Sequence, residues 1–92
     1  MEEIRHFVKT TAEYFSKKAP REITFADADN FDFEIYQRCQ EWNSLSPEKS
    51  FEEEFPEFAE LWEELSTWNA QDDWDLAKCE RIIAKAKIAA NC

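Results

Sequence analysis

The 92-residue chain contains no glycine, and this absence limits both its turns and its active-site chemistry. Hairpins built on Asn-Gly or Asp-Gly turns depend on glycine for positive φ, so they are excluded. Phosphate-binding loops, the GxGxxG turn of dinucleotide-binding domains and the nucleophile elbow of hydrolases also need glycine, for a tight turn or a close backbone approach. The absence of glycine therefore limits both the folds and the functions that this chain can have.

Apolar residues recur at helical spacing in four segments, which predicts four main helices joined by short connections. These helices predict a mainly α fold, a compact bundle that forms a single acidic domain over residues 1–92. Pro20 terminates the first helix, and Asp29 or Asn30 fits the N-cap of the second. Residues 23–25 alternate briefly and fit one short strand, although three residues do not decide it. The predicted helices cover residues 2–18, 30–42, 56–69 and 73–90.

The connection before the third main helix allows two helix starts. Ser46 fits an N-cap with Pro47 at the first helical position, whereas Ser50 and Glu53 fit a capping box further along. A short helical turn is expected over Pro47–Glu54. Pro56 disfavours helical geometry at the residue before it, so the third main helix is expected to begin at Pro56.

Negative charge is concentrated in the middle of the chain. Residues 22–75 hold 17 acidic side chains against Arg38 and Lys49, a local net charge of −15 in a chain whose total is −10. The flanks are basic, with +2 over residues 1–21 and +3 over residues 76–92. Concentrated like charge opposes a compact fold by self-repulsion. Aromatic residues make up 15% of the chain, which favours a folded domain despite this repulsion. We therefore expect the negative field to attract a binding partner.

Glutamates of the third main helix follow helical spacing. Glu57, Glu60 and Glu64 occupy positions i, i+3 and i+7, and Glu63 adjoins them. No lysine or arginine occurs in residues 50–77, so the row is uncompensated within its own helix. Neighbours in such a row lie roughly 5–6 Å apart. That separation is of the order of the phosphate spacing on DNA, where each strand carries one charge per about 3.4 Å of axis.

These acids predict a surface that binds a partner in place of DNA phosphates. The alternative is that these acids form a solvent-exposed face that only keeps the protein in solution. The basic residues lie mainly in the two flanks of the sequence. We therefore expect the terminal helices to neutralise part of the acidic segment 22–75 and to confine the remaining charged surface to one side. The predicted partner-binding residues are Glu57, Glu60, Glu63 and Glu64, extended by Glu52, Glu53, Glu54, Asp72, Asp73 and Asp75, with a second cluster at Asp27, Asp29, Asp32 and Glu34.

The sequence offers no recognisable catalytic or metal site. His6 is the only histidine, so no triad can be nominated and Glu3-Ile4-Arg5-His6 has no second copy to build a di-iron bundle. Asp27-x-Asp29 resembles the start of an EF-hand, but Asp32 stands where that loop needs glycine. We therefore predict a protein that is not an enzyme and has no cofactor and no metal site.

The cysteines and the apolar runs predict a cytoplasmic protein without membrane contact. Cys39, Cys79 and Cys92 are an odd number without CxxC spacing, and the first two fall on predicted apolar faces. The acidic N-terminus lacks the apolar region of a signal peptide. No apolar run approaches the roughly 18 residues of a membrane-spanning helix.

The tryptophans suggest an alternative function for the protein. Trp42, Trp62, Trp68 and Trp74 are most often core residues, but Trp68 and Trp74 flank an acidic loop and are expected to be partly exposed. Aromatic residues are enriched at protein interfaces, so this pair would suit a small phage or bacterial regulator that docks on a host protein such as RNA polymerase. Stacking on nucleic acid normally accompanies a positive groove, so direct nucleic-acid binding is not expected.

Small size, strong acidity, abundant aromatics and the lack of catalytic residues together resemble the phage-encoded DNA-mimic proteins, in particular the anti-restriction proteins of T-even phages. The resemblance extends along the whole chain in size and charge character. It implies a homodimer in the host cytoplasm whose acidic surface imitates duplex DNA. The implied target is a restriction endonuclease of the McrBC type, with nucleoid proteins as other candidates.

Overall fold

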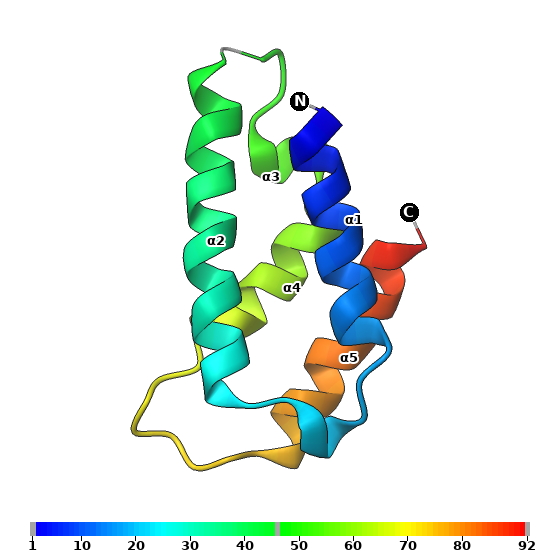
Figure 1. The fold of residues 1–92 in the computed structure, drawn as a ribbon, viewed down its shortest axis with the longest axis vertical. Coiled ribbons are helices and arrows are strands. Elements are labelled where there is room, and N and C mark those ends of the chain that lie inside the picture. Colours follow the sequence, from blue (N-terminus) through cyan, green and yellow to red (C-terminus); the bar gives the residue numbers. More distant parts are fainter. Residues whose placement is uncertain (1, 46, 92) are drawn as a thin grey trace.

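The computed structural model describes residues 2–45 and 47–91, and every regular element in these ranges is helical (Figure 1). The predicted mainly α fold is therefore confirmed. Four long helices, α1, α2, α4 and α5, are joined through a 3-10 turn, η1, and a single-turn helix, α3. The elements are α1 Glu2–Ser16, η1 Pro20–Glu22, α2 Phe25–Ser44, α3 Phe51–Glu54, α4 Pro56–Ser66 and α5 Leu76–Ala90.

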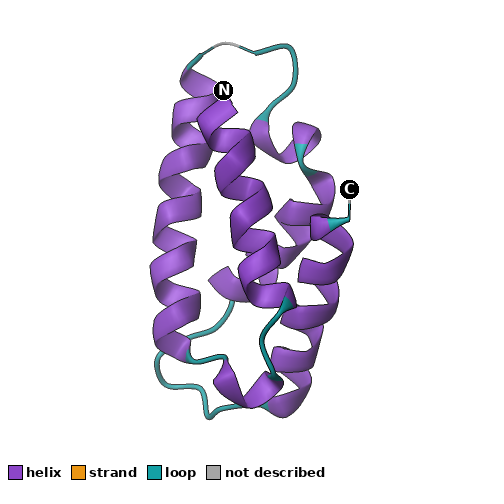
Figure 2. Cartoon of the chain, turned by 45° about the vertical axis from the view of Figure 1, so that its right-hand side comes forward, coloured by secondary structure: helices purple, strands orange, loops and turns teal. Residues whose placement is uncertain are grey.

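The helices form a flattened body of 39 × 27 × 17 Å in which α1 and α4 both pack on α5. α2 lies along one edge, and α4 crosses obliquely behind it in Figure 1. Figure 2 shows the connecting segments gathered at the two ends of the bundle. Because α2 is an edge helix that rests mainly on α4, a large part of its circumference faces solvent.

A single core of buried side chains holds the helices together. The aromatic rings of Phe15, Phe51 and Phe58 are almost fully buried and come from three different helices. Burying a large apolar side chain stabilises a fold by about 1.5–3 kcal/mol, so these rings are principal contributors. The contribution of α2 is one stripe along the helix, Ala28, Ile35, Cys39 and Trp42.

The start of α2 differs from the prediction. The helix begins at Phe25 rather than near Asn30, because the Thr24 side chain accepts a hydrogen bond of 3.2 Å from the Asp27 backbone N–H and caps it. The predicted strand at residues 23–25 is wrong. Ile23 ends the η1 turn and is fully buried, whereas Thr24 is exposed. The apolar–polar alternation arose because Ile23 is buried between exposed neighbours, and not because these residues pair with a strand.

The start of α3 follows the capping box and not Pro47. Ser50 Oγ accepts from the Glu53 N–H at 3.3 Å, and Glu53 Oε1 accepts from the Ser50 N–H at 3.1 Å. A helical turn beginning at Pro47 is therefore wrong, and the proposed cap at Ser46 lies outside the described residues. α4 begins at Pro56, as predicted.

The last connection is longer than predicted. α4 ends at Ser66, and α5 begins at Leu76 after the Asp75 side chain accepts a hydrogen bond of 3.0 Å from the Ala77 N–H. Cys39 and Cys79 are buried, as their apolar positions predicted, while Cys92 lies outside the described residues. Over the part of the chain that the structure describes, no helix combines the length and apolarity needed to cross a membrane.

Candidate functional site

The core packing of α4 leaves the predicted glutamates unequally exposed. Phe58, Leu61 and Leu65 are buried and define the inner side. Since successive residues turn by about 100°, Glu60 and Glu63 lie on the outer side of the helix, and both are exposed. Glu57 and Glu64 share a face with Glu60 but lie nearer the core, where Glu64 meets the cations of α5, and both are only partly exposed. The row predicted from spacing is therefore not one continuous exposed surface.

Glu64 is the carboxylate that the basic C-terminal helix neutralises. Its oxygens accept from Lys85 Nζ at 2.7 Å, from Arg81 Nε at 3.3 Å and from Lys78 Nζ at 3.4 Å. Its side chain is only 12% exposed. Burial by itself would raise the pKa of Glu64, but the hydrogen bonds and charges of these three cations outweigh it and hold the pKa below its ordinary value. Glu64 thus joins α4 to α5 and is removed from the surface available to a partner.

Two more of the predicted acids are committed to local structure. Glu54 Oε2 accepts from Arg5 Nη1 at 3.1 Å, which neutralises part of α3 from the N-terminal helix. Hydrogen bonds with the backbone N–H and the side chain of Ser50 lower the pKa of Glu53, which serves the capping box. Both basic flanks of the sequence therefore meet the acidic block in the fold, at Glu54 and Glu64.

Three further acids of α3 and α4, Glu52, Glu60 and Glu63, line an open hollow. Its volume is about 360 Å³, and none of the described residues that line it carries a positive charge. Glu60 and Glu63 are exposed and make no ion pair with any described residue, and the same holds for Glu52. We call this feature the Trp62 hollow; its lining is Glu52, Ala59, Glu60, Trp62, Glu63 and Ser66.

The Trp62 ring is fixed by contacts on both sides. Its Nε1 donates a hydrogen bond of 2.7 Å to Asp32 Oδ1 of α2, and its ring lies edge-on to Phe51, with centroids 6.1 Å apart. The indole thus connects the second predicted cluster, on α2, to the acids of α3 and α4. Two clusters separated by about 30 positions in sequence form one surface through this bond.

Helical register divides the α2 cluster between two flanks of the helix. Asp29 lies three residues before Asp32 on the α4 side of the helix and is exposed. Asp27 and Glu34 fall on the other flank, where Phe31 contacts Phe15 of α1. We define the acidic face as the acids on the α4 side of α2 together with those of the hollow: Asp29, Asp32, Glu52, Glu60 and Glu63.

The acids after α4 lie in the loop that leads to α5. Asp72 Oδ2 accepts from the Asn69 N–H at 3.0 Å, and Asp75 caps α5. Asp73 is exposed and has no ion-pair partner among the described residues. These side chains follow the C-terminal end of α4, beyond Ser66 of the Trp62 hollow, and do not line it.

The exposed aromatics differ from those that the sequence indicated. Trp68 is 6% exposed and packs on Phe25, so its predicted exposure is wrong. Trp74 is 47% exposed, although its Nε1 donates to the Ile23 carbonyl at 3.1 Å. Sequence reasoning missed Phe33, which is 63% exposed on α2 next to the acidic face. Its position away from the buried stripe of α2 was the available signal.

Comparisons with protein-family models, with curated proteins and with solved structures give no match for this chain. Among the described residues, no group of three or more histidine, cysteine, aspartate or glutamate side chains is arranged to hold a metal ion.

Proposed function

We propose that the protein binds the basic DNA-contacting surface of a host DNA-binding protein and competes there with DNA. The observation that supports this most is the Trp62 hollow, where Glu52, Glu60 and Glu63 surround a locked indole without a single cation in the described lining. Arg5 pairs instead with Glu54, and Lys78, Arg81 and Lys85 pair with Glu64. None of these cations reaches the carboxylates of the hollow, so the charge there stays uncompensated by the described residues.

The chemistry of the proposed contact is that of phosphate recognition. DNA-binding proteins hold the duplex backbone largely with lysine and arginine. Glu60 and Glu63 are one helical turn apart, roughly 5–6 Å, which suits adjacent cations of such a surface. An arginine at the hollow would also lie against the Trp62 indole, where a cation over an aromatic ring gains about 0.5–2 kcal/mol. Complementary charge speeds association and fixes orientation.

The rigidity of the acidic face favours binding over a passive solubility role. α4 is tied to α2 through Asp32 and Trp62 and to α5 through Glu64. Side chains on a fixed helix lose less freedom on binding than those on a mobile segment. The carboxylates are therefore presented in a defined pattern before the partner arrives.

The proposed target is a restriction endonuclease of the McrBC type or a nucleoid protein, and the proposed active form is a homodimer in the host cytoplasm. The longest dimension of one domain is 39 Å. At 3.4 Å per base pair this length matches roughly eleven base pairs of DNA. A second copy lengthens the charged surface to the scale of a longer binding site.

Affinity capture from bacterial lysate tests the proposal. The wild-type protein should retain a DNA-binding protein that elutes early in a salt gradient, since screening weakens contacts between exposed charges. The double variant Glu60→Lys/Glu63→Lys should lose it, while Glu80→Lys, an exposed glutamate of α5, should keep it. Retention by the double variant, or capture only of proteins without a DNA-binding surface, contradicts the proposal.

Exposure of Phe33 supports a second candidate function, a regulator that docks on a host protein such as RNA polymerase through aromatics. Trp68 is buried and no longer suits this role, whereas Trp74 remains 47% exposed, and Phe33 and Tyr36, which is 51% exposed, are further candidate anchors. Phe33→Ala/Tyr36→Ala would then abolish capture and added salt would change it little. In the proposed DNA-mimic function, charge reversal has the larger effect.

A further inference from the structure

The outer side of α2 carries a stripe of uncharged residues. α2 is the edge helix of the bundle, and its buried stripe faces the other helices (Figure 1). On the opposite side, exposed residues recur at alternating steps of four and three, the spacing with which one helix packs along another. We call this row the outer stripe; its members are Ala26, Asn30, Phe33, Gln37, Gln40 and Ser44.

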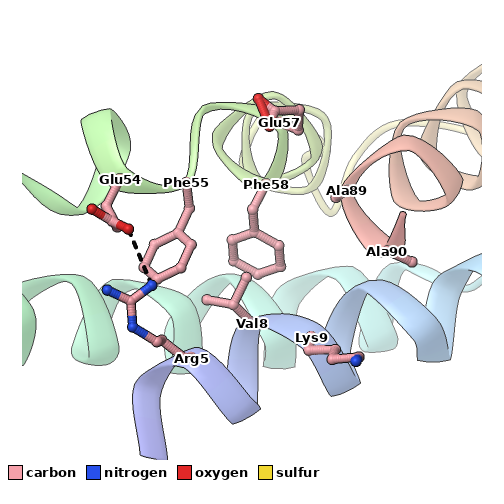
Figure 3. Close-up of a pocket in the computed structure, with 9 residues that line it drawn as sticks. All are labelled: Arg5, Val8, Lys9, Glu54, Phe55, Glu57, Phe58, Ala89 and Ala90. Atoms are coloured by element: carbon pink, nitrogen blue, oxygen red, sulfur yellow. Dashed lines mark hydrogen bonds and ion pairs between the residues drawn. The ribbon is translucent and has the colours of Figure 1, made fainter. Parts of the chain in front are cut away.

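The absence of charge distinguishes the outer stripe from its surroundings. A helix side that only meets water typically carries charged residues, and the acids and the arginine of α2 all lie off the stripe. By contrast, four charged side chains surround the pocket between α1 and α4 in Figure 3: Arg5, Lys9, Glu54 and Glu57. Another protein chain can therefore pack on the outer stripe without desolvating a charged member of it.

Two large aromatic side chains are exposed at the centre of this surface. Phe33 belongs to the outer stripe, and Tyr36 lies beside it on the flank that faces α4. Gln40 Nε2 donates a hydrogen bond of 2.8 Å to the Tyr36 hydroxyl, which orders the phenol. Exposed aromatics next to uncharged polar groups are typical of protein interfaces.

We propose that the outer stripe binds the outer stripe of a second copy of this chain, with the two α2 helices antiparallel. In the register that brings Phe33 of one copy against Tyr36 of the other, a two-fold axis passes between residues 34 and 35. The aromatic contact then occurs twice, as two-fold symmetry requires. The same register places Asp29 opposite Gln40 of the other copy, whose amide has a second N–H for the carboxylate.

Charge favours this occupant and this orientation. Each copy has a formal net charge of −10, so two copies repel unless they meet through an uncharged surface. In the antiparallel register, the two Asp29 residues are roughly 16 Å apart along the helices, beyond the Debye length at physiological salt. A parallel pair would instead place them side by side.

The antiparallel pair also joins the two acidic faces. The two-fold axis runs between the helices at right angles to both, so the α4 flank of each α2 stays on the same side of the dimer. Asp29 and Asp32 of both copies therefore belong to one continuous charged surface. The use of that surface rests on the proposed function, whereas the interface follows from the outer stripe alone.

Sedimentation velocity over a dilution series tests the dimer. A contact along one helix, about 30 Å long, is smaller than a standard interface of roughly 800 Å² per partner, so the dimer should dissociate on dilution. Added salt should strengthen it by screening the repulsion between the copies, although salt weakens capture of the proposed target. A chain that stays monomeric up to about 1 mM overturns the proposal.

Matched double variants locate the interface. Phe33→Ala/Tyr36→Ala removes the aromatic contacts and should raise the Kd of the dimer at least about tenfold. Leu45→Ala/Leu76→Ala removes two other exposed apolar side chains, outside the outer stripe, and should leave the Kd unchanged. Circular dichroism checks that both variants are folded. Equal Kd values for the two variants would place the contact elsewhere and overturn the proposal.

Crosslinking distinguishes the two orientations. In a Cys92→Ser background, where Cys39 and Cys79 are buried, a short bismaleimide should join two copies of Gln37→Cys. It should not join two copies of Ser44→Cys, which lie roughly 28 Å apart along the antiparallel helices. Crosslinking of both variants to the same extent would indicate a parallel pair and overturn the register.

The failure of this interface differs from the failure of the DNA-mimic function. If the chain dimerises as described but captures no DNA-binding protein, only the DNA-mimic function fails. If wild type is monomeric and Phe33→Ala/Tyr36→Ala loses a captured target, the outer stripe binds that target instead of a second copy. That result overturns the dimer interface.

Discussion

The indole Nε1 of Trp62 donates a hydrogen bond of 2.7 Å to Oδ1 of Asp32, and this bond joins the acids of α2 to those of α3 and α4. Without this bond, no hydrogen bond among the described residues would link a carboxylate of α2 to the residues that line the hollow. The same bond holds the Trp62 ring in position as the base of the hollow. The acidic face is therefore a product of tertiary structure.

Trp62→Phe tests this relationship. The variant retains an aromatic ring but removes the donor, so the free energy of unfolding should fall by about 1.5–3 kcal/mol, the range for hydrogen bonds to charged groups. Urea denaturation measures the change. The matched variant Trp74→Phe removes a bond from a more exposed indole to a neutral carbonyl and should cost less. If Trp74→Phe lowers the free energy of unfolding as much as Trp62→Phe or more, the hydrogen bond to Asp32 does not stabilise the fold more than the bond to the Ile23 carbonyl does.

Glu64→Gln should destabilise the fold by about 1–3 kcal/mol, because it leaves three cations of α5 around a neutral group. Glu60→Gln, at an exposed position without an ion pair to a described residue, is the control and should change stability little. Thermal or urea unfolding distinguishes the two. Similar stability of both variants would contradict the central role of Glu64 between α4 and α5.

The lowered pKa of Glu64 also predicts a pH dependence. A group whose pKa is lower in the folded protein stabilises the fold above its unfolded pKa, and that stabilisation is lost as pH falls through the folded pKa. The stability difference between wild type and Glu64→Gln should therefore be full near neutral pH and shrink in acid. A difference that stays constant down to the acid-unfolding range would contradict this assignment.

Thr11→Val should raise stability by about 1 kcal/mol. Thr11 is 2% exposed, and its Oγ1 is a buried side-chain oxygen without a hydrogen-bond partner among the described residues. Valine has nearly the same shape and removes the desolvated hydroxyl. Thr10→Val is the control, because Thr10 Oγ1 is exposed and donates to the Phe7 carbonyl. A stability loss in Thr11→Val would indicate a partner for this hydroxyl.

The buried thiols should react slowly. Burial raises the pKa of the Cys39 and Cys79 thiols, so little thiolate is present near neutral pH. In a Cys92→Ser background, both should resist iodoacetamide in the native protein and react readily in denaturant. Rapid labelling of the native protein at either position would contradict the burial seen in the core.

Helical periodicity was sufficient to predict the fold class and the main helices, because their apolar stripes are regular. The ends were less predictable, since Thr24 and Asp75 act as caps only once the neighbouring turns are formed. The glutamate spacing of α4 was visible in sequence, but the burial of Glu64 among three cations was not. Glu64 meets cations 14 to 21 positions later in the chain, a contact that depends on how α4 and α5 pack.

Phe33 illustrates the same limit at the candidate site. Its apolar character suggests burial, but α2 is an edge helix with one buried stripe, and Phe33 lies off that stripe. Conversely, Trp68 follows α4 near an acidic loop, yet it packs inwards on Phe25. The register of α2 places Phe33 off the buried stripe, but periodicity along one helix does not show whether another element covers that side.

The most direct test of the central claim is competition between this protein and duplex DNA for a captured target, followed by fluorescence anisotropy of labelled DNA. The wild-type protein should displace the DNA, and Glu60→Lys/Glu63→Lys should need at least about tenfold more protein, a change of about 1.4 kcal/mol. Glu80→Lys should match wild type. If the double variant is folded and displaces DNA as well as wild type does, the acidic face does not act as the DNA mimic.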